Sequence, residues 1–155
     1  MTIPYQTDVD RGTFVITDAV ALEKDNFVGL NPSTGKLRVG GEDGDIPVGI
    51  VIKSKNGIPS ELTGNAEGSN EAVVRGGIDI EFDVTGVTGL ANLSADVFAT
   101  SATTLSLTNP GSALAAGYVK RHISGTKAIV HLYDLTEAKI ADAAASAGAG
   151  GGGGV

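Results

Sequence analysis

Apolar and polar residues alternate without exception between residues 78 and 85 of this chain. The apolar positions are Ile78, Ile80, Phe82 and Val84, and the polar positions are Asp79, Glu81, Asp83 and Thr85. A period of two residues is typical of a β-strand with one buried and one solvated face. The pattern therefore predicts a strand over 78–85 that directs three carboxyl groups to the same side.

Short runs rich in valine and isoleucine recur along the chain, separated by Gly, Asn, Asp, Ser and Pro. They give candidate strands at 13–17, 27–30, 36–40, 47–54, 71–76, 78–85, 96–100, 105–108, 117–123 and 127–133. This spacing is typical of all-β proteins and predicts a compact β-barrel or β-sandwich of short antiparallel strands. We expect one or two of these candidates not to form strands.

The segments between the candidate strands predict turns and one long loop. In NPSTGK, residues 31–36, Pro32 presets φ and Gly35 suits a left-handed residue, so a hairpin is expected there. SGTK at 124–127 has the same role between the last two candidates. The polar stretch 55–70 is too long for a tight turn, so we expect an exposed loop that is available to a partner.

The chain divides into an extended N-terminal arm at 1–12, a β domain at 13–134 and a C-terminal part at 135–155. Asp134 and Glu137 have the spacing of a capping box, which predicts the start of a short Ala-rich helix. The end of the chain, AGAGGGGGV, offers little apolar surface to bury, and glycine loses the most entropy on ordering. We therefore expect a flexible Ala/Gly-rich tail after the helix.

Composition and charge narrow the classes of function. Hydrophobic residues make up 41% of the chain and aromatic residues 5%, so we expect a folded core of Val, Ile, Leu and Ala. The net charge of -7 repels a polyanion, and the single basic cluster, 120–122, fits one strand end. We expect no nucleic-acid partner. The absence of cysteine excludes disulfides, thiolate zinc sites and cysteine nucleophiles.

The chain also has no segment that predicts a membrane partner. Its first residues, MTIPYQTDVDRG, have neither the basic start nor the apolar run of a signal peptide. Nor does any stretch reach the 18 or so consecutive apolar residues that a membrane-spanning helix needs. We expect a soluble protein that is made in the cytoplasm.

The acidic residues Asp79, Glu81 and Asp83 are the first candidates for chemistry. Alternate carboxylates on one strand face lie about 7 Å apart, a separation compatible with an inverting glycosidase. Such an enzyme needs one carboxyl group in an apolar pocket, and sugar sites commonly use aromatic platforms, whereas this chain has no tryptophan and three tyrosines. A solvated strand face is therefore the favoured interpretation.

Two further groups could bind a metal ion. Glu42, Asp43 and Asp45 lie in a glycine-rich loop and offer oxygen ligands to calcium, although the ligand spacing of a helix-loop-helix calcium motif is missing. His122 and His131 lie on neighbouring candidate strands and could approach each other, but two histidines without a third ligand make a poor site. An acidic turn and unrelated histidines are favoured, so we expect no metal.

The sequence lacks the patterns of common catalytic sites. No serine stands in a Gly-x-Ser-x-Gly elbow, and no glycine-rich loop is followed by the Lys and Ser/Thr of a phosphate-binding loop. We therefore expect neither an enzyme nor a cofactor.

The region from 73 to 134 nevertheless has a recognisable order of strands and turns. It contains an alternating strand that ends in DVTGVT, the segment ANLSADVFAT, the strand TTLSLT and the hairpin GYVKRHISGTKAIVHL. With the earlier runs GTFVITDAVALEKDNFVGLNPSTGKLRVG and PVGIVIKS, it resembles the small capsid decoration, or cement, proteins of tailed bacteriophages. The resemblance covers roughly 130 residues and rests on strand types and turns.

This resemblance implies a structural virion protein on the outer surface of a phage capsid, which stabilises the expanded head by bridging subunits of the major capsid protein. It also implies self-association, as a homotrimer rather than a dimer. The residues expected to contact the capsid or other subunits are Ile3, Pro4, Tyr5, Ile58, Pro59, Leu62, Asp79, Glu81 and Asp83. One alternative is a β-sandwich adhesin or carbohydrate-binding module, which could bind calcium through Glu42, Asp43 and Asp45. The other is a glycosidase that uses Asp79, Glu81 or Asp83.

Overall fold

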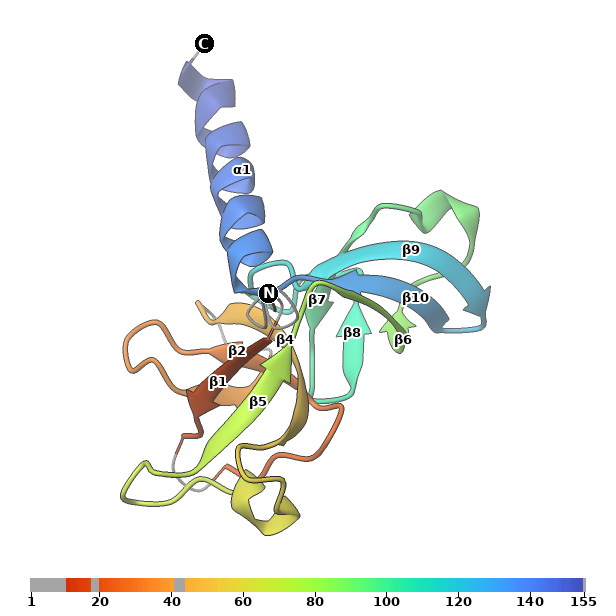
Figure 1. Ribbon diagram of the computed structural model, residues 1–155. Helices are drawn as coiled ribbons and strands as arrows, with labels where there is room; N and C mark the ends of the chain where they lie inside the picture. The colour runs from red at the N-terminus through yellow and green to blue at the C-terminus, as the bar shows by residue number, and fades with distance from the viewer. Residues whose placement is uncertain (1–10, 18–19, 41–43, 155) are drawn as a thin grey trace, which may run out of the picture.

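The computed structural model describes residues 11–17, 20–40 and 44–154, and Figure 1 shows their arrangement. The described chain is mostly β-structure, with five strands in a first sheet, five in a closed barrel and one C-terminal helix. The all-β fold predicted from the sequence is confirmed. Arg11 and Gly12, which were predicted to lie in the N-terminal arm, belong to the first strand, and residues 1–10 lie outside the described residues.

The first sheet has the strand order β1-β5-β4-β2-β3, with every neighbouring pair antiparallel. Its strands are β1 (Arg11–Val15), β2 (Phe27–Leu30), β3 (Leu37–Val39), β4 (Ile46–Ser54) and β5 (Glu71–Arg75). Just beyond β1, Ile16 forms a parallel bridge to Leu37, and the Thr17 N–H donates to the Leu37 carbonyl at 2.8 Å. These bonds draw the two edges of the sheet together and satisfy backbone groups that would otherwise be unpaired.

The barrel contains the second half of the chain and closes in the order β10-β6-β8-β7-β9. Its strands are β6 (Ile78–Thr85), β7 (Asp96–Ala99), β8 (Thr104–Ser106), β9 (Gly117–Ser124) and β10 (Lys127–Leu132). The expectation of antiparallel strands is wrong for one pair, because β6 and β8 run parallel. Strands β7 and β8 form a hairpin. The barrel closes when β8 pairs with the free edge of β6, and the two strands run in the same direction there.

All ten candidate strands are present among the described residues, so the expectation that one or two would not form strands is wrong. The physical reason is that the chain builds two small β units, each of which needs five strands to enclose its apolar residues. Both limits of β2 and β6 agree with the predicted ranges, and no limit of the other strands differs from its prediction by more than two residues.

The apolar face of β6 points into the barrel, as its alternation predicts, and the two β units share part of their packing. The barrel core contains Phe82, Val84, Val97, Leu105, Val119, Val130 and Leu132, together with Phe27 and Ile50 from the first sheet. The second cluster lies within the first sheet and contains Ile16, Leu22, Val28, Leu37, Val51, Leu62 and Val74. Phe27 and Ile50 therefore extend from the first sheet into the barrel core, while the second cluster is separate from it.

The helix α1 (Leu135–Gly154) begins with the predicted capping box. The Glu137 N–H donates to Asp134 Oδ1 at 2.7 Å, and the Asp134 N–H donates to Glu137 Oε1 at 3.2 Å. The base of α1 packs on β4, where Ala138 is buried and Leu135 contacts the first-sheet core, and the rest rises away from both β units (Figure 1).

The helix is longer than the short helix predicted, because helical geometry continues through the glycine run to Gly154. Glycine keeps the backbone N–H and carbonyl that propagate a helix, and it costs only about 1 kcal/mol per residue relative to alanine. No helix among the described residues is long and apolar enough to cross a membrane.

Candidate functional site

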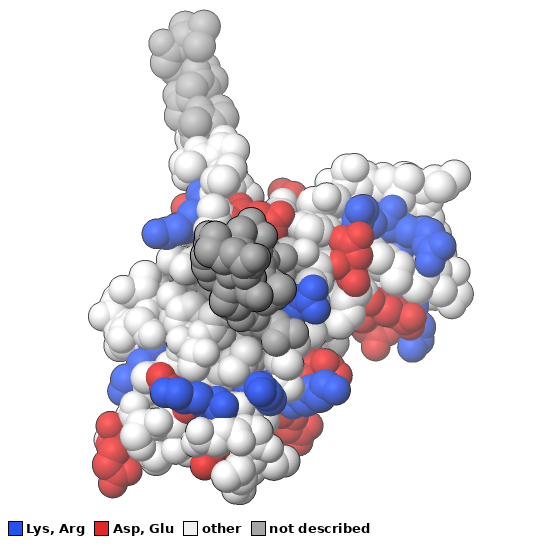
Figure 2. Space-filling view, viewed as in Figure 1, with Lys and Arg blue, Asp and Glu red and all other residues white. Residues whose placement is uncertain are grey.

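The acidic face of β6 pairs with cations of the chain's own barrel strands. Asp79 lies directly opposite His131 of β10, and Asp83 lies opposite Lys127. Asp79 Oδ2 is 3.0 Å from Lys120 Nζ of β9, and Glu81 Oε1 is 3.6 Å from Lys127 Nζ. Figure 2 shows acidic and basic side chains interspersed on this part of the barrel. Asp79 and Glu81 are exposed in the single chain, and the charges of this face are partly neutralised within the chain.

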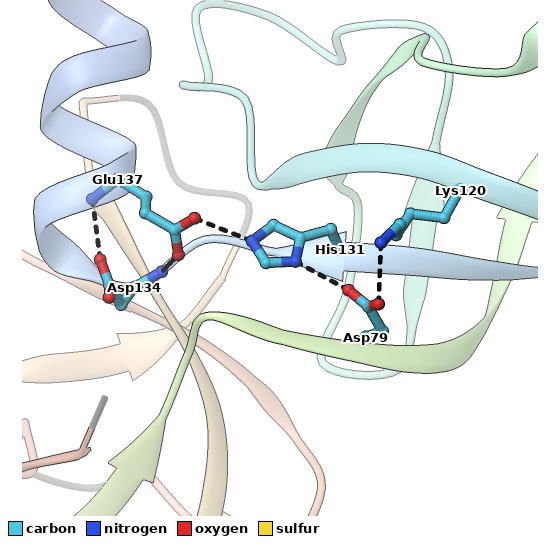
Figure 3. Close-up of polar contacts among 5 residues, drawn as sticks. All are labelled: Asp79, Lys120, His131, Asp134 and Glu137. Atoms are coloured by element: carbon cyan, nitrogen blue, oxygen red, sulfur yellow. Dashed lines mark hydrogen bonds and ion pairs between the residues drawn. The ribbon is translucent and has the colours of Figure 1, made fainter. Parts of the chain in front are cut away.

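His131 is the centre of the most connected polar cluster in the described chain, which Figure 3 shows. Its Nδ1 lies 2.8 Å from Asp79 Oδ1, and its Nε2 lies 2.8 Å from Glu137 Oε2. The cluster continues through Asp79 to Lys120 and through Glu137 to Asp134. It therefore connects β6, β9 and β10 of the barrel to the first turn of α1, and we call it the His131 link.

The electrostatics of the His131 link favour charged side chains. Burial lowers the pKa of His131, but its hydrogen bonds to Glu137 and Asp79 outweigh burial and raise that pKa above its ordinary value. Hydrogen bonds from His131 and then Lys120 lower the pKa of Asp79, and the bond to Asp79 raises the pKa of Lys120. A low carboxyl pKa is the opposite of what a general acid needs, which argues against Asp79 as the general acid of a glycosidase.

An open groove of about 630 Å³ runs beside the His131 link, between the end of β5 and the barrel. It is lined by Arg75, Gly77, Ile78, Asp79, Ile80, Tyr118, Lys120 and His131. The Tyr118 ring lies 5.3 Å from the His131 ring, centroid to centroid, and gives the groove one aromatic wall. Both ring nitrogens of His131 face carboxylates, so neither is available as a catalytic base. The groove can hold a ligand but offers no assembled acid and base.

The other acids of β6 border a second hollow. Glu81 and Asp83 line a depression of about 260 Å³ together with Asp25 and Lys127. Among the residues that the structure describes, no three His, Asp or Glu side chains are arranged to hold a metal ion.

The calcium hypothesis meets a competing contact at Asp45. The Asp45 carboxylate is buried and accepts two hydrogen bonds from Arg38, at 2.6 Å from Nε and 2.7 Å from Nη2. This bidentate pair already uses both carboxylate oxygens. Glu42 and Asp43 lie outside the described residues.

The two histidines do not form a pair. His122 lies opposite Ala128 and its Nε2 is 3.0 Å from the Gly125 carbonyl, whereas His131 lies opposite Tyr118. The β10–β9 register therefore separates the side chains that the sequence placed on neighbouring strands.

The 55–70 loop contains a short 3-10 helix, η2 (Pro59–Leu62). Some residues of this segment are exposed and others are buried. Ile58 is 48% exposed and Pro59 is also exposed, as expected of contact residues. The expectation that Leu62 contacts a partner is wrong, because its side chain is buried in the first-sheet core. Burial of its apolar area stabilises the fold more than exposure to water would. Ile3, Pro4 and Tyr5 lie outside the described residues.

Sequence reasoning did not identify the His131 link or the exposed leucines of the β6–β7 connection. Asp79 and His131 are 52 residues apart in sequence, and no local pattern reports which strands pair at that distance. Leu90, which is 84% exposed, and Leu93 lie at the short 3-10 helix η3 (Leu90–Asn92). Two leucines in a turn-like segment are the feature of the sequence that could have indicated an exposed apolar pair.

No protein-family model matches this chain, and no curated protein matches its sequence.

Proposed function

We propose that this protein is a structural virion protein that binds the outer surface of a tailed-phage capsid and stabilises the expanded head by bridging major capsid protein subunits. The observation that carries the proposal is the set of exposed aliphatic side chains on the barrel, at Leu90, Leu93 and Ile123. A contiguous patch of exposed apolar side chains marks a protein interaction surface, and we propose that these three side chains belong to one. The resemblance of 73–134 to decoration proteins supplies the kind of partner.

The architecture supports a bridging role. The 3-10 helix η3 packs against β9, the strand that contains Ile123. Leu90 and Leu93 therefore lie at an element next to this strand. Ile58, at the 55–70 loop of the first sheet, is a second exposed aliphatic position on a different part of the molecule. A body with separate apolar contact points, whose two β units are joined by Phe27 and Ile50, can hold two neighbouring subunits in a fixed relation.

The expected contact set changes with the structure. Ile3, Pro4, Tyr5, Ile58 and Pro59 stay in it, and Leu90, Leu93 and Ile123 join it. Asp79, Glu81 and Asp83 remain exposed enough to meet a partner, but such a partner would share them with cations of this chain. Self-association as a homotrimer is part of the same proposal.

Binding to expanded, undecorated capsids encoded by the same genome tests the proposal. We expect the purified protein to cosediment with these capsids and to raise their melting temperature. Leu90→Ser with Leu93→Ser should weaken binding by roughly tenfold or more, because two interface aliphatic side chains are lost. Ile140→Ser, which removes an exposed aliphatic side chain from α1, is the matched control. Absence of binding by the unchanged protein would refute the proposal.

A carbohydrate-binding module is the second candidate, and the groove beside Tyr118 favours it. Arg75 lines this groove and forms no ion pair with any described residue, so its guanidinium can bind an acidic or hydroxyl-rich ligand. Binding of a glycan on an array that Tyr118→Ala abolishes would support this function, whereas unchanged binding would exclude this groove. A calcium titration that leaves stability unchanged would remove its calcium-dependent form.

A further inference from the structure

Both ring nitrogens of His131 face carboxylate oxygens at hydrogen-bond distance. Nδ1 is 2.8 Å from Asp79 and Nε2 is 2.8 Å from Glu137. A carboxylate oxygen only accepts, so each contact needs an N–H on the ring. The imidazolium form carries both N–H groups, whereas the neutral ring carries one and would turn a lone pair toward the other carboxylate. The geometry of the link therefore suits one protonation state of His131.

The two carboxylates differ in how firmly they are held. Asp79 is directly opposite His131 in the β6–β10 ladder and also accepts from Lys120, so its position does not depend on His131 alone. Glu137 belongs to α1, and its other oxygen accepts the Asp134 N–H of the capping box. When the ring loses a proton, the tautomer that keeps the N–H on Nδ1 retains Asp79, and the Glu137 contact is lost.

We propose that the His131 link is a pH-sensitive connection between the barrel and α1, in which the imidazolium form of His131 holds the first turn of the helix through Glu137 and the neutral form releases it. Leu135 and Ala138 still hold the base of α1 on the first sheet after release. The expected change is therefore a wider range of helix directions and not a loss of the helix. This inference is independent of the proposed partner.

The groups around His131 set the direction of the effect. They are Asp79 of β6, Tyr118 and Lys120 of β9, Tyr133 at the end of β10, Glu137 of α1 and Arg75 at the end of β5. The two carboxylates bond the ring directly, while Lys120 acts through Asp79 and Arg75 lies across the groove. Tyr133 lies with its ring 6.1 Å from the His131 ring, and burial raises the pKa of its hydroxyl further above the ordinary value, so it stays neutral when His131 titrates.

The sign follows from the raised pKa of His131 in the folded protein. A group whose pKa is higher in the folded than in the unfolded state stabilises the fold fully below its unfolded value, about 6.5 for histidine. This contribution is lost as the pH rises through the folded value. The link is thus complete below about pH 6.5 and opens as the pH rises through the raised folded-state pKa of His131.

A distance measurement on the full chain tests this proposal. The chain has no cysteine, so Ser124→Cys on β9 and Ser146→Cys on α1 allow two spin labels to be placed at chosen sites. We expect electron spin resonance to give a narrow distance distribution at about pH 5.5 and a broad one at about pH 9.5. The midpoint of this change should equal the midpoint of the His131 imidazole titration measured by nuclear magnetic resonance.

Glu137→Gln is the decisive variant because it changes the charge and keeps the shape. Its amide oxygen can still accept from Asp134, and its amide N–H can donate to the neutral ring. The pKa of His131 should fall, because the charge of Glu137 is lost, and the pH dependence of the distance distribution should disappear. His122→Gln, at the other histidine, should change neither. A distribution that stays constant while His131 titrates in the unchanged protein would overturn the proposal, as would an unaltered pH response in Glu137→Gln.

Discussion

Gly76 lies in the connection from β5 to β6, where this segment crosses the connection from β10 to α1. A Cβ at this position would be 2.5 Å from the Tyr133 carbonyl oxygen and 2.5 Å from the Asp134 Cα, both of them backbone atoms. Backbone cannot move aside as the end of a flexible side chain can, so this crossing requires glycine. The same crossing places Asp134 and Glu137 within reach of the barrel.

Gly76→Ala should destabilise the protein by about 2–3 kcal/mol, because the added methyl group forces the two connections apart. Urea unfolding followed by circular dichroism measures the effect. Gly89→Ala is the matched control, since a Cβ at Gly89 would meet no atom within 4 Å. Equal stability of the two variants would contradict the tight crossing.

The buried pair Arg38 and Asp45 is the second feature that a single residue decides. Asp45 has a side chain that is 4% exposed, and Arg38 bonds both of its oxygens. Removal of one partner from such a pair leaves an uncompensated buried charge, which costs more than the pair contributed.

Arg38→Met should therefore lower the free energy of unfolding by about 3 kcal/mol. The comparison is Lys55→Met, which breaks an ion pair between the exposed Lys55 and Glu71 and should change stability much less. Chemical denaturation of both variants at neutral pH measures the difference. Similar losses in the two variants would show that burial of Asp45 does not control the outcome.

At the scale of elements, α1 combines a well-fixed first turn with a long projecting part. The capping box, Leu135 and Ala138 act within that turn, and the Ala/Gly-rich remainder rises from the body (Figure 1). An isolated helix of this composition is marginal in water, so the packed first turn supplies most of the stability of the element. The direction of α1 consequently depends on a few residues at its base.

Leu135→Ala should destabilise the protein by roughly 2 kcal/mol, because it removes apolar contacts with the first-sheet core. Ile140→Ala on the same helix should have an effect below about 0.5 kcal/mol, since Ile140 is exposed. Hydrogen exchange of the β4 amides should accelerate in the first variant and not in the second. Unchanged β4 protection in Leu135→Ala would contradict the packing of α1 on this strand.

At the scale of the whole molecule, the first sheet and the barrel act as one body. Phe27 and Ile50 belong to the first sheet by hydrogen bonding and to the barrel core by packing. The Phe27 N–H also donates to the Ala102 carbonyl of the barrel half at 2.7 Å. Shared apolar contacts of this kind couple the unfolding of the parts that share them.

We expect one calorimetric unfolding transition, and Phe27→Ala should lower the free energy of unfolding by about 3–5 kcal/mol without splitting it. The reason is that the lost ring contacts both β units. Two resolved transitions in the unchanged protein, with only one of them moved by Phe27→Ala, would show that the units unfold separately.

The features that depend on neighbours along the chain could be predicted from the sequence. They are the alternation at 78–85, the Asp134 and Glu137 capping box and the Gly35 turn, with φ of 70°, each of which is defined by a few consecutive residues. Other contacts could be known only from the folded chain: Asp79 with His131, the parallel pairing of β6 and β8, the burial of Leu62 and the packing of Phe27 in the barrel core. These contacts depend on register and packing between distant segments, which local periodicity does not encode.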